Sequence, residues 1–216
     1  MTTTSILDGP RVAPASGREP GSIVVLTHGY GSNGADLIGL VPYWRQALPD
    51  TLFVSPNAPY PCPGAPGGYQ WWSLEGADRS AGVRSAAPIV DAFIDAELAR
   101  YALTDDRLAL VGFSQGTMLA LHVGLRRERQ LAGIVGYSGA LIDEAALAAE
   151  IKSRPPVLLI HGDADPMIPV AAFHKAREGL GRLGLDVTAH VSAGLGHSID
   201  PAGLELGEQF LARALG

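Results

Sequence analysis

The feature that most constrains the fold is a series of short apolar runs that do not alternate with polar residues. Strands buried on both faces of a parallel sheet have this pattern, whereas strands with one face in water alternate. The runs are Ile23–Thr27, Thr51–Val54, Arg107–Phe113, Leu131–Tyr137 and Val157–Ile160. Only the last predicted strand, Asp186–Val191, alternates.

Segments with apolar residues at helical spacing lie between these runs. The predicted helices are Ala35–Ala47, Ala87–Tyr101, Gln115–Arg127, Asp143–Lys152, Val170–Leu183 and Pro201–Leu215. Strands and helices that alternate along a chain predict an α/β fold, with a mostly parallel central sheet and helices on both faces. Ligands bind such sheets at the carboxyl ends of the strands.

A length of 216 residues suits a single domain. We expect residues 1–20, which are polar and interrupted by Pro10 and Pro14, to be a flexible N-terminal lead-in, and residues 21–216 to form one α/β domain. The net charge of −6 argues against nucleic acid as a partner. The chain has a single cysteine, and it shows neither a signal-peptide pattern nor an apolar run of membrane-spanning length. These features predict a cytoplasmic protein without membrane insertion.

Gly112-Phe113-Ser114-Gln115-Gly116 matches the Gly-x-Ser-x-Gly pattern of a nucleophile elbow. It follows an apolar run and opens a predicted helix, which is the context that the pattern requires. So sharp a turn leaves no room for side chains two residues before or after the serine. We therefore predict that Ser114 is a nucleophile, held in a strained conformation at a helix N-terminus. The alternatives are a chance match and an ordinary helix cap.

A serine hydroxyl needs a base, and histidine is the usual one. In folds with this elbow the order along the chain is nucleophile, acid, then histidine. Of the six histidines, His197 alone follows every candidate acid and lies in a glycine-rich loop after the last predicted strand. It is the predicted base, and a histidine in an ordinary surface loop is the alternative.

Three aspartates compete for the role of the acid. Asp163 and Asp165 follow the run Val157–Ile160, and Asp143 follows the run before it. Pro166 biases Asp165 toward an extended conformation, whereas Asp163 suits a turn. Position alone favours Asp165 and leaves the other two open.

An oxyanion hole needs two N–H donors. We predict one at Gln115, directly after the nucleophile, and one at Tyr30, in the turn after the first strand. The segment Gly29–Gly34 also matches the Gly-x-Gly-x-x-Gly fingerprint of dinucleotide binding. That fingerprint requires an acidic residue at the end of the second strand, which instead leads into Ser55-Pro56-Asn57. A dinucleotide-dependent oxidoreductase is therefore the weaker alternative.

The histidines lack the spacing of metal ligands and the carboxylates do not cluster, so the sequence predicts no metal. It also predicts no cofactor. The Pro- and Gly-rich segment 56–84 is longer than loops without a function usually are, and we expect it to serve the site.

Several motifs taken together resemble one family. The segments Leu26–Gly31, Val111–Gly116, His161–Pro169 and Gly196–His197, with the aromatic segment Gln70–Leu74, resemble the phospholipase/carboxylesterase family of small α/β-hydrolases, which includes the acyl-protein thioesterases. The resemblance covers most of the chain.

The resemblance implies a minimal α/β-hydrolase fold without a large lid domain. It implies Ser114 as nucleophile, Asp165 as acid and His197 as base. It also implies an oxyanion hole made by the N–H groups of Tyr30 and Gln115.

Substrate-binding residues are predicted around these positions. Trp72 stands where bacterial members commonly have phenylalanine, which would narrow or reshape the acyl pocket. Met167, Ile168 and Leu195 flank the acid and the base, and they are expected either to line the substrate groove or to belong to the local core.

We therefore expect a serine carboxylesterase that hydrolyses carboxylic esters with small to medium acyl groups through an acyl-enzyme. Lysophospholipase and acyl-protein thioesterase activity are alternatives with the same triad. A hydrolase fold used only for binding is a further alternative. An apolar groove would also suit a homodimer interface, which leaves the oligomeric state open.

Overall fold

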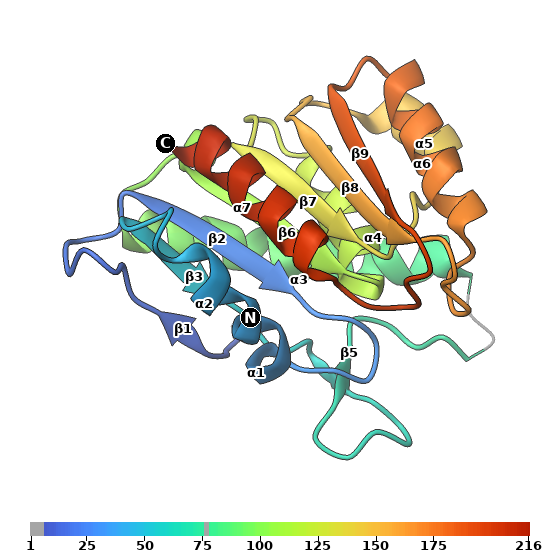
Figure 1. The fold of residues 1–216 in the computed structure, drawn as a ribbon, viewed down its shortest axis with the longest axis horizontal. Helices are drawn as coiled ribbons and strands as arrows, with labels where there is room; N and C mark the ends of the chain where they lie inside the picture. The colour runs from blue at the N-terminus through green and yellow to red at the C-terminus, as the bar shows by residue number, and fades with distance from the viewer. Residues whose placement is uncertain (1–6, 76–77) are drawn as a thin grey trace, which may run out of the picture.

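The computed structural model describes residues 7–75 and 78–216, and in this part of the chain the main sheet has seven strands (Figure 1). Their order across the sheet is β1-β3-β2-β6-β7-β8-β9, and every neighbouring pair is parallel except β1 with β3. The strands are β1 (Arg11–Val12), β2 (Ser22–Thr27), β3 (Thr51–Val54), β6 (Leu108–Phe113), β7 (Gly133–Tyr137), β8 (Val157–Gly162) and β9 (Val187–Ser192).

Successive strands are added on one side of β2 as far as β3 and on the other side of β2 from β6 onward. The chain runs outward from β2 to β3, then returns to the other side of β2 and continues through β7, β8 and β9. Thr27 pairs with Gly112, so the carboxyl ends of β2 and β6 finish side by side. Ligand sites of open α/β sheets lie at such reversals. The fold thus brings together the segments that begin at His28 and Ser114.

Helices cover both faces of the sheet, as predicted. One face carries α1 (Gly34–Leu37), α2 (Val41–Trp44) and α7 (Pro201–Leu215), and α7 crosses the near side of the strands in Figure 1. The other face carries α3 (Arg79–Arg100), α4 (Gln115–Gly124), α5 (Glu144–Glu150) and α6 (Val170–Arg182).

Consecutive residues of one strand pack into different layers. Leu110 lies in the core beneath α3 and α4, and Val111 lies in the core beneath α7. Both side chains are fully buried. Because side chains alternate between the two faces of a strand and both faces are covered, successive positions in the middle of these strands are apolar.

Two helices differ from their predicted extents. The predicted helix over 35–47 is divided into α1, a short 3₁₀ helix (Ile38–Leu40) and α2, where Pro42 occupies the first turn. Proline lacks an N–H donor, so it suits a helix start and not a helix interior. In addition, α3 begins at Arg79, before the predicted start at Ala87, because Asp78 caps it by accepting a 2.9 Å hydrogen bond from the Ser80 N–H.

The part of the predicted lead-in over residues 1–20 that the structure describes packs against the rest of the fold. Leu7 is buried, β1 pairs with β3, and Arg11 donates two hydrogen bonds of 2.6 and 2.8 Å to Glu97 of α3. Residues 1–6 lie outside the described residues. These partners are far away in sequence, so local composition gave no sign of them.

The connection between β3 and α3 contains a small hairpin, β4 (Tyr60–Pro61) with β5 (Tyr69–Gln70). It is the long Pro- and Gly-rich segment of the sequence. The part of it that the structure describes forms no helical layer over the sheet. The architecture is therefore a minimal version of the predicted fold.

The nucleophile elbow leads to a first prediction, about stability. A Cβ atom at Gly116 would lie 1.8 Å from the Thr27 carbonyl oxygen, whereas a Cβ at Gly181 in α6 would meet nothing within 4 Å. Gly116→Ala should therefore cost about 3 kcal/mol or more in the free energy of unfolding. Gly181→Ala should instead stabilise the protein, by up to about 1 kcal/mol. Urea unfolding of both variants checks this, and equal midpoints would contradict it.

Candidate active site

Ser114 joins β6 to α4 in a strained conformation. Its φ of 55° and ψ of −114° lie outside the regions that L-residues favour. The Ser114 N–H donates a 2.9 Å hydrogen bond to the Tyr137 carbonyl. The Thr117 hydroxyl lies 2.8 Å from the Gly112 carbonyl oxygen and 2.7 Å from that of Tyr137. These bonds attach the elbow to β7 and offset the cost of the strain.

Asp165 and His197 form a direct pair. His197 Nδ1 lies 2.7 Å from Asp165 Oδ2, and Asp165 Oδ1 accepts hydrogen bonds from the N–H groups of Met167 (2.8 Å) and Ile168 (2.9 Å). The carboxylate is completely buried, and the imidazole is 20% exposed. A carboxylate only accepts, so Nδ1 carries the proton and Nε2 of a neutral ring is free to accept another.

The charge state of Asp165 follows from the same contacts. Burial opposes ionisation, but the hydrogen bonds from the Ile168 N–H, His197 and the Met167 N–H outweigh it and lower the pKa of Asp165 below its usual value. Asp165 is therefore ionised at neutral pH and can stabilise a positive charge on His197.

The Asp165–His197 pair approaches Ser114 through its neighbour Phe113. The rings of Phe113 and His197 lie 4.9 Å apart between centroids. The contacts of residues 7–75 and 78–216 include no hydrogen bond between the Ser114 hydroxyl and His197. Such bonds often tighten only when substrate is bound.

The two other candidate acids have different partners. Asp163 accepts a 2.6 Å hydrogen bond from the Gly194 N–H, which joins its segment to the loop that carries His197. Asp143 accepts from the Arg84 guanidinium at 2.6 Å and from the Ser80 hydroxyl at 2.8 Å. Neither carboxylate contacts His197, so the geometry favours Asp165.

The predicted oxyanion donors flank the elbow. A Cβ at Gly29 would lie 3.3 Å from Ser114 Cβ, so the backbone before Tyr30 packs directly on the nucleophile. Gln115 is the first residue of α4, and its N–H has no acceptor within the helix. By contrast, the N–H groups of Gly31 and Ser32 already donate to backbone carbonyls, which leaves them no hydrogen for the phosphates of a dinucleotide.

The four predicted substrate-binding residues differ in exposure. Met167 is 69% exposed beside the acid, and Leu195 is half-buried beside the base. Ile168 and Trp72 are 7% and 3% exposed and belong to the core. Trp72 packs against Gly82 in the first turns of α3.

Two residues next to the site were not assigned from the sequence. His161 lies with its Nε2 2.8 Å from the Ile168 carbonyl oxygen and 3.4 Å from Asp165 Oδ2. His28 is completely buried beneath the Tyr30 turn. Each directly follows a predicted apolar run and precedes a glycine, as His28-Gly29 and His161-Gly162, and this shared pattern could have identified them.

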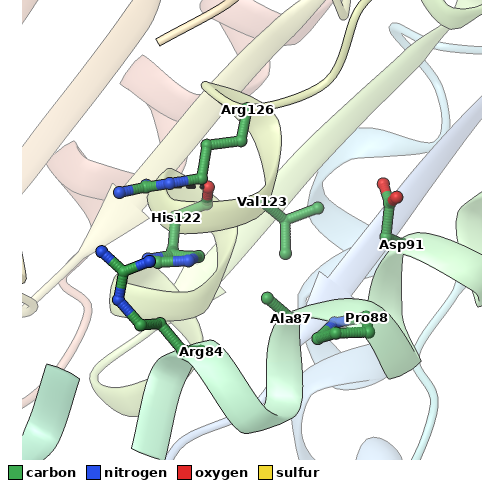
Figure 2. A pocket seen from close by; sticks show the side chains of 7 residues that line it. All are labelled: Arg84, Ala87, Pro88, Asp91, His122, Val123 and Arg126. Atoms are coloured by element: carbon green, nitrogen blue, oxygen red, sulfur yellow. Dashed lines mark hydrogen bonds between the residues drawn. The ribbon is translucent and has the colours of Figure 1, made fainter. Parts of the chain in front are cut away.

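A groove of about 300 Å³ lies between α3 and α4, and none of the predicted site residues lines it (Figure 2). In Figure 2 the His122 ring lies between the guanidinium groups of Arg84 and Arg126. Its Nδ1 is buried without a hydrogen-bond partner in the described residues. Burial, with the positive charges of Arg126 and Arg84, lowers the pKa of His122 to about 4.

This shift predicts a pH dependence of stability. As the pH falls, His122 of the unfolded chain is protonated near its ordinary pKa of 6.5, whereas His122 of the folded protein is protonated only at its lowered pKa of about 4. Stability contributed by the neutral ring should therefore be present above pH 6.5 and fall by up to about 2 kcal/mol toward pH 4. Urea unfolding between pH 7 and 4 should show a smaller decrease in His122→Leu than in the wild type. The same decrease in both would contradict the shift.

Two further features of the structure concern metal binding and membrane crossing. Among the described residues, no three His, Cys, Asp or Glu side chains gather in the manner of metal ligands. No helix in that part of the chain combines the length and the apolar character that crossing a bilayer requires.

Comparison with known proteins places this geometry in a family. A family model described as Phospholipase/Carboxylesterase matches residues 8–215. The chain is 28% identical to acyl-protein thioesterase 1 of Neurospora crassa, over 95% of this chain and 91% of that protein. It is 32% identical to esterase YpfH of Escherichia coli K12, over 82% and 76% of the two chains.

A solved structure agrees closely. The crystal structure of esterase PE8 superposes with a TM-score of 0.92 and 46% sequence identity, covering 97% of this chain and 99% of that one. These comparisons confirm the predicted family resemblance and the predicted α/β-hydrolase fold. They also confirm the predicted enzyme class, a hydrolase of carboxylic ester bonds. The chain belongs to the phospholipase/carboxylesterase family of α/β-hydrolases.

Proposed function

We propose that this protein is a serine carboxylesterase for esters of small to medium acyl groups, with Ser114 as nucleophile, His197 as base and Asp165 as acid. The observation that carries the proposal is the meeting of two features at one edge of the sheet. A strained serine follows β6, and the buried Asp165 carboxylate holds His197 at 2.7 Å beside Phe113.

The reaction proceeds in two halves. His197 Nε2 removes the Ser114 proton while the serine oxygen attacks the ester carbonyl, and the oxyanion accepts hydrogen bonds from the Tyr30 and Gln115 N–H groups. His197 then gives the proton to the leaving alcohol, and an acyl-enzyme remains. Water, activated by His197, releases the carboxylic acid and restores Ser114.

The substrate contacts follow from exposure. Met167 offers an open apolar surface next to the acid, and Leu195 offers a smaller one next to the base. Trp72 and Ile168 are held in the core and offer a substrate little side-chain surface. Of the four residues, only Met167 and Leu195 present apolar surface beside the triad, and this supports small to medium acyl groups.

A series of p-nitrophenyl esters from acetate to palmitate tests the substrate class. We expect kcat/KM to be highest between two and eight acyl carbons and to fall at least about tenfold by palmitate, since a chain too long for the pocket displaces the ester carbonyl from its position for attack. Ser114→Ala supplies the blank.

Other outcomes would change the proposal in defined ways. Rates sustained to palmitate would contradict the acyl range and favour lysophospholipid or acyl-protein thioester substrates, which present the same carbonyl to the same triad. A palmitoyl thioester and a lysophospholipid, assayed side by side, separate these two. No Ser114-dependent hydrolysis of any ester would leave a fold used only for binding.

A further inference from the structure

We propose that His28 is a positioning residue for the oxyanion hole, one that sets the direction of the Tyr30 N–H through the peptide bond between Gly29 and Tyr30. This inference rests on the proposed function and extends it to a residue that does not touch the substrate. His28 directly follows β2 and is completely buried, so its imidazole is not available to the reacting atoms.

Both ring nitrogens of His28 are bonded to backbone groups of known polarity. Nδ1 lies 2.8 Å from the Gly29 carbonyl oxygen, and Nε2 lies 3.0 Å from the Ala58 nitrogen. A carbonyl can only accept and an amide N–H can only donate, so Nδ1 carries the hydrogen and Nε2 is bare. Burial lowers the pKa of His28 and keeps the ring in this neutral form.

The 2.8 Å bond from His28 to the Gly29 oxygen fixes where the next N–H points, together with a longer, 3.2 Å bond that the same oxygen accepts from the Ser32 N–H. The Gly29 carbonyl and the Tyr30 N–H belong to one planar peptide unit, and no peptide bond in the described residues is cis. In a trans unit the C=O and the N–H point in opposite directions. Holding the carbonyl toward the His28 ring therefore directs the Tyr30 N–H away from it. Within the described residues that N–H donates to no protein acceptor.

Trp71 links His28 to Gln115, the residue of the other predicted donor. The Trp71 indole N–H donates to the His28 carbonyl at 2.9 Å, and the two rings lie 5.3 Å apart. The Gln115 side chain accepts from the Trp71 N–H at 3.0 Å and donates to the Trp72 carbonyl at 2.9 Å. One chain of contacts thus links the two residues whose N–H groups must converge on the oxyanion.

Two substitutions separate this role from mere support of the fold. In His28→Asn the amide nitrogen can replace Nδ1 and donate to Gly29, but nothing reaches Ala58. In His28→Gln the amide oxygen can replace Nε2 and accept from Ala58, but the bond to Gly29 is lost. Each variant therefore keeps one of the two ring contacts, and each removes similar ring volume.

Steady-state hydrolysis of p-nitrophenyl butyrate gives the readout. We expect kcat of His28→Gln to be about tenfold to hundredfold below that of His28→Asn, a part of the loss seen when a whole oxyanion donor is removed. KM should stay within about threefold, because the oxyanion forms only after binding. Equal kcat values, or a faster glutamine variant, would overturn the inference.

A second measurement is made on the wild-type protein and uses the variants only to assign the signal. Nitrogen NMR of the wild-type imidazoles should show a histidine protonated at Nδ1 and bare at Nε2 at pH 7, assigned to His28 by its loss in either variant. The opposite tautomer, or a doubly protonated ring, would overturn the inference even if a variant fails to fold. Wild-type protein without Ser114-dependent hydrolysis would instead refute the proposed function.

Discussion

Replacing Ser114 with alanine should lower kcat for ester hydrolysis by about 10⁶-fold, with little change in KM. The alanine cannot form the acyl-enzyme, and only the oxyanion hole and substrate binding remain to accelerate the reaction. The fold should be retained, since the hydroxyl makes no hydrogen bond to His197 that would be lost. Measured turnover of p-nitrophenyl butyrate, with the protein checked by circular dichroism, gives the comparison.

Ser138 is the matched control for this substitution. It follows β7, the strand next to β6, and also has a positive φ, of 45°. Its hydroxyl makes only a 3.4 Å hydrogen bond, to the Ser198 carbonyl. Ser138→Ala should keep kcat within about tenfold of the wild type. If Ser114→Ala lost no more activity than Ser138→Ala, Ser114 would not be the nucleophile.

Replacing Asp165 with asparagine should lower kcat by about 10⁴-fold, the second largest effect expected. The asparagine retains an oxygen for the Met167 and Ile168 N–H groups, so the loop should keep its shape. However, an amide NH₂ facing His197 would favour the tautomer with Nε2 protonated, which cannot accept the proton of Ser114. The loss should appear in kcat, and KM should change little.

Asp163→Asn provides the control, two residues away in the same segment. Asp163 accepts one hydrogen bond from the Gly194 N–H, and an asparagine oxygen can accept it equally well. This variant should keep kcat within about tenfold of the wild type. Comparable losses in the two variants would assign the effect to disturbance of the loop and would remove Asp165 from the triad.

The strands could be predicted because burial on both faces leaves a local signature. Continuous apolar runs need no knowledge of their neighbours, and β2, β3, β6, β7 and β8 lie where these runs are. The early start of α3 leaves no such signature. Its first turns contain Gly82, whose missing side chain accommodates the Trp72 ring from a separate segment. The packing of the N-terminal segment could not be predicted either, because the bond between Arg11 and Glu97 joins residues far apart in sequence.

The residues of the candidate site likewise fall into those with a local signal in the sequence and those without one. Ser114, with its flanking glycines, was predictable because the elbow's steric demands fall on adjacent positions. His197 followed from its order along the chain, and Asp165 from Pro166 together with the family resemblance. His28 and His161 were passed over because neither has the position of a base. Their contacts with the Gly29 and Ile168 carbonyls appear only when the loops are folded.

Trapping the acyl-enzyme tests most directly the central claim that Ser114 carries the acyl group. The protein would be treated with a p-nitrophenyl fluorophosphonate or with p-nitrophenyl butyrate quenched in acid, and its intact mass and proteolytic peptides measured. We predict one equivalent of adduct, on the peptide containing Ser114, and none in Ser114→Ala. An adduct on another residue, or full hydrolytic activity without any adduct on Ser114, would contradict the claim.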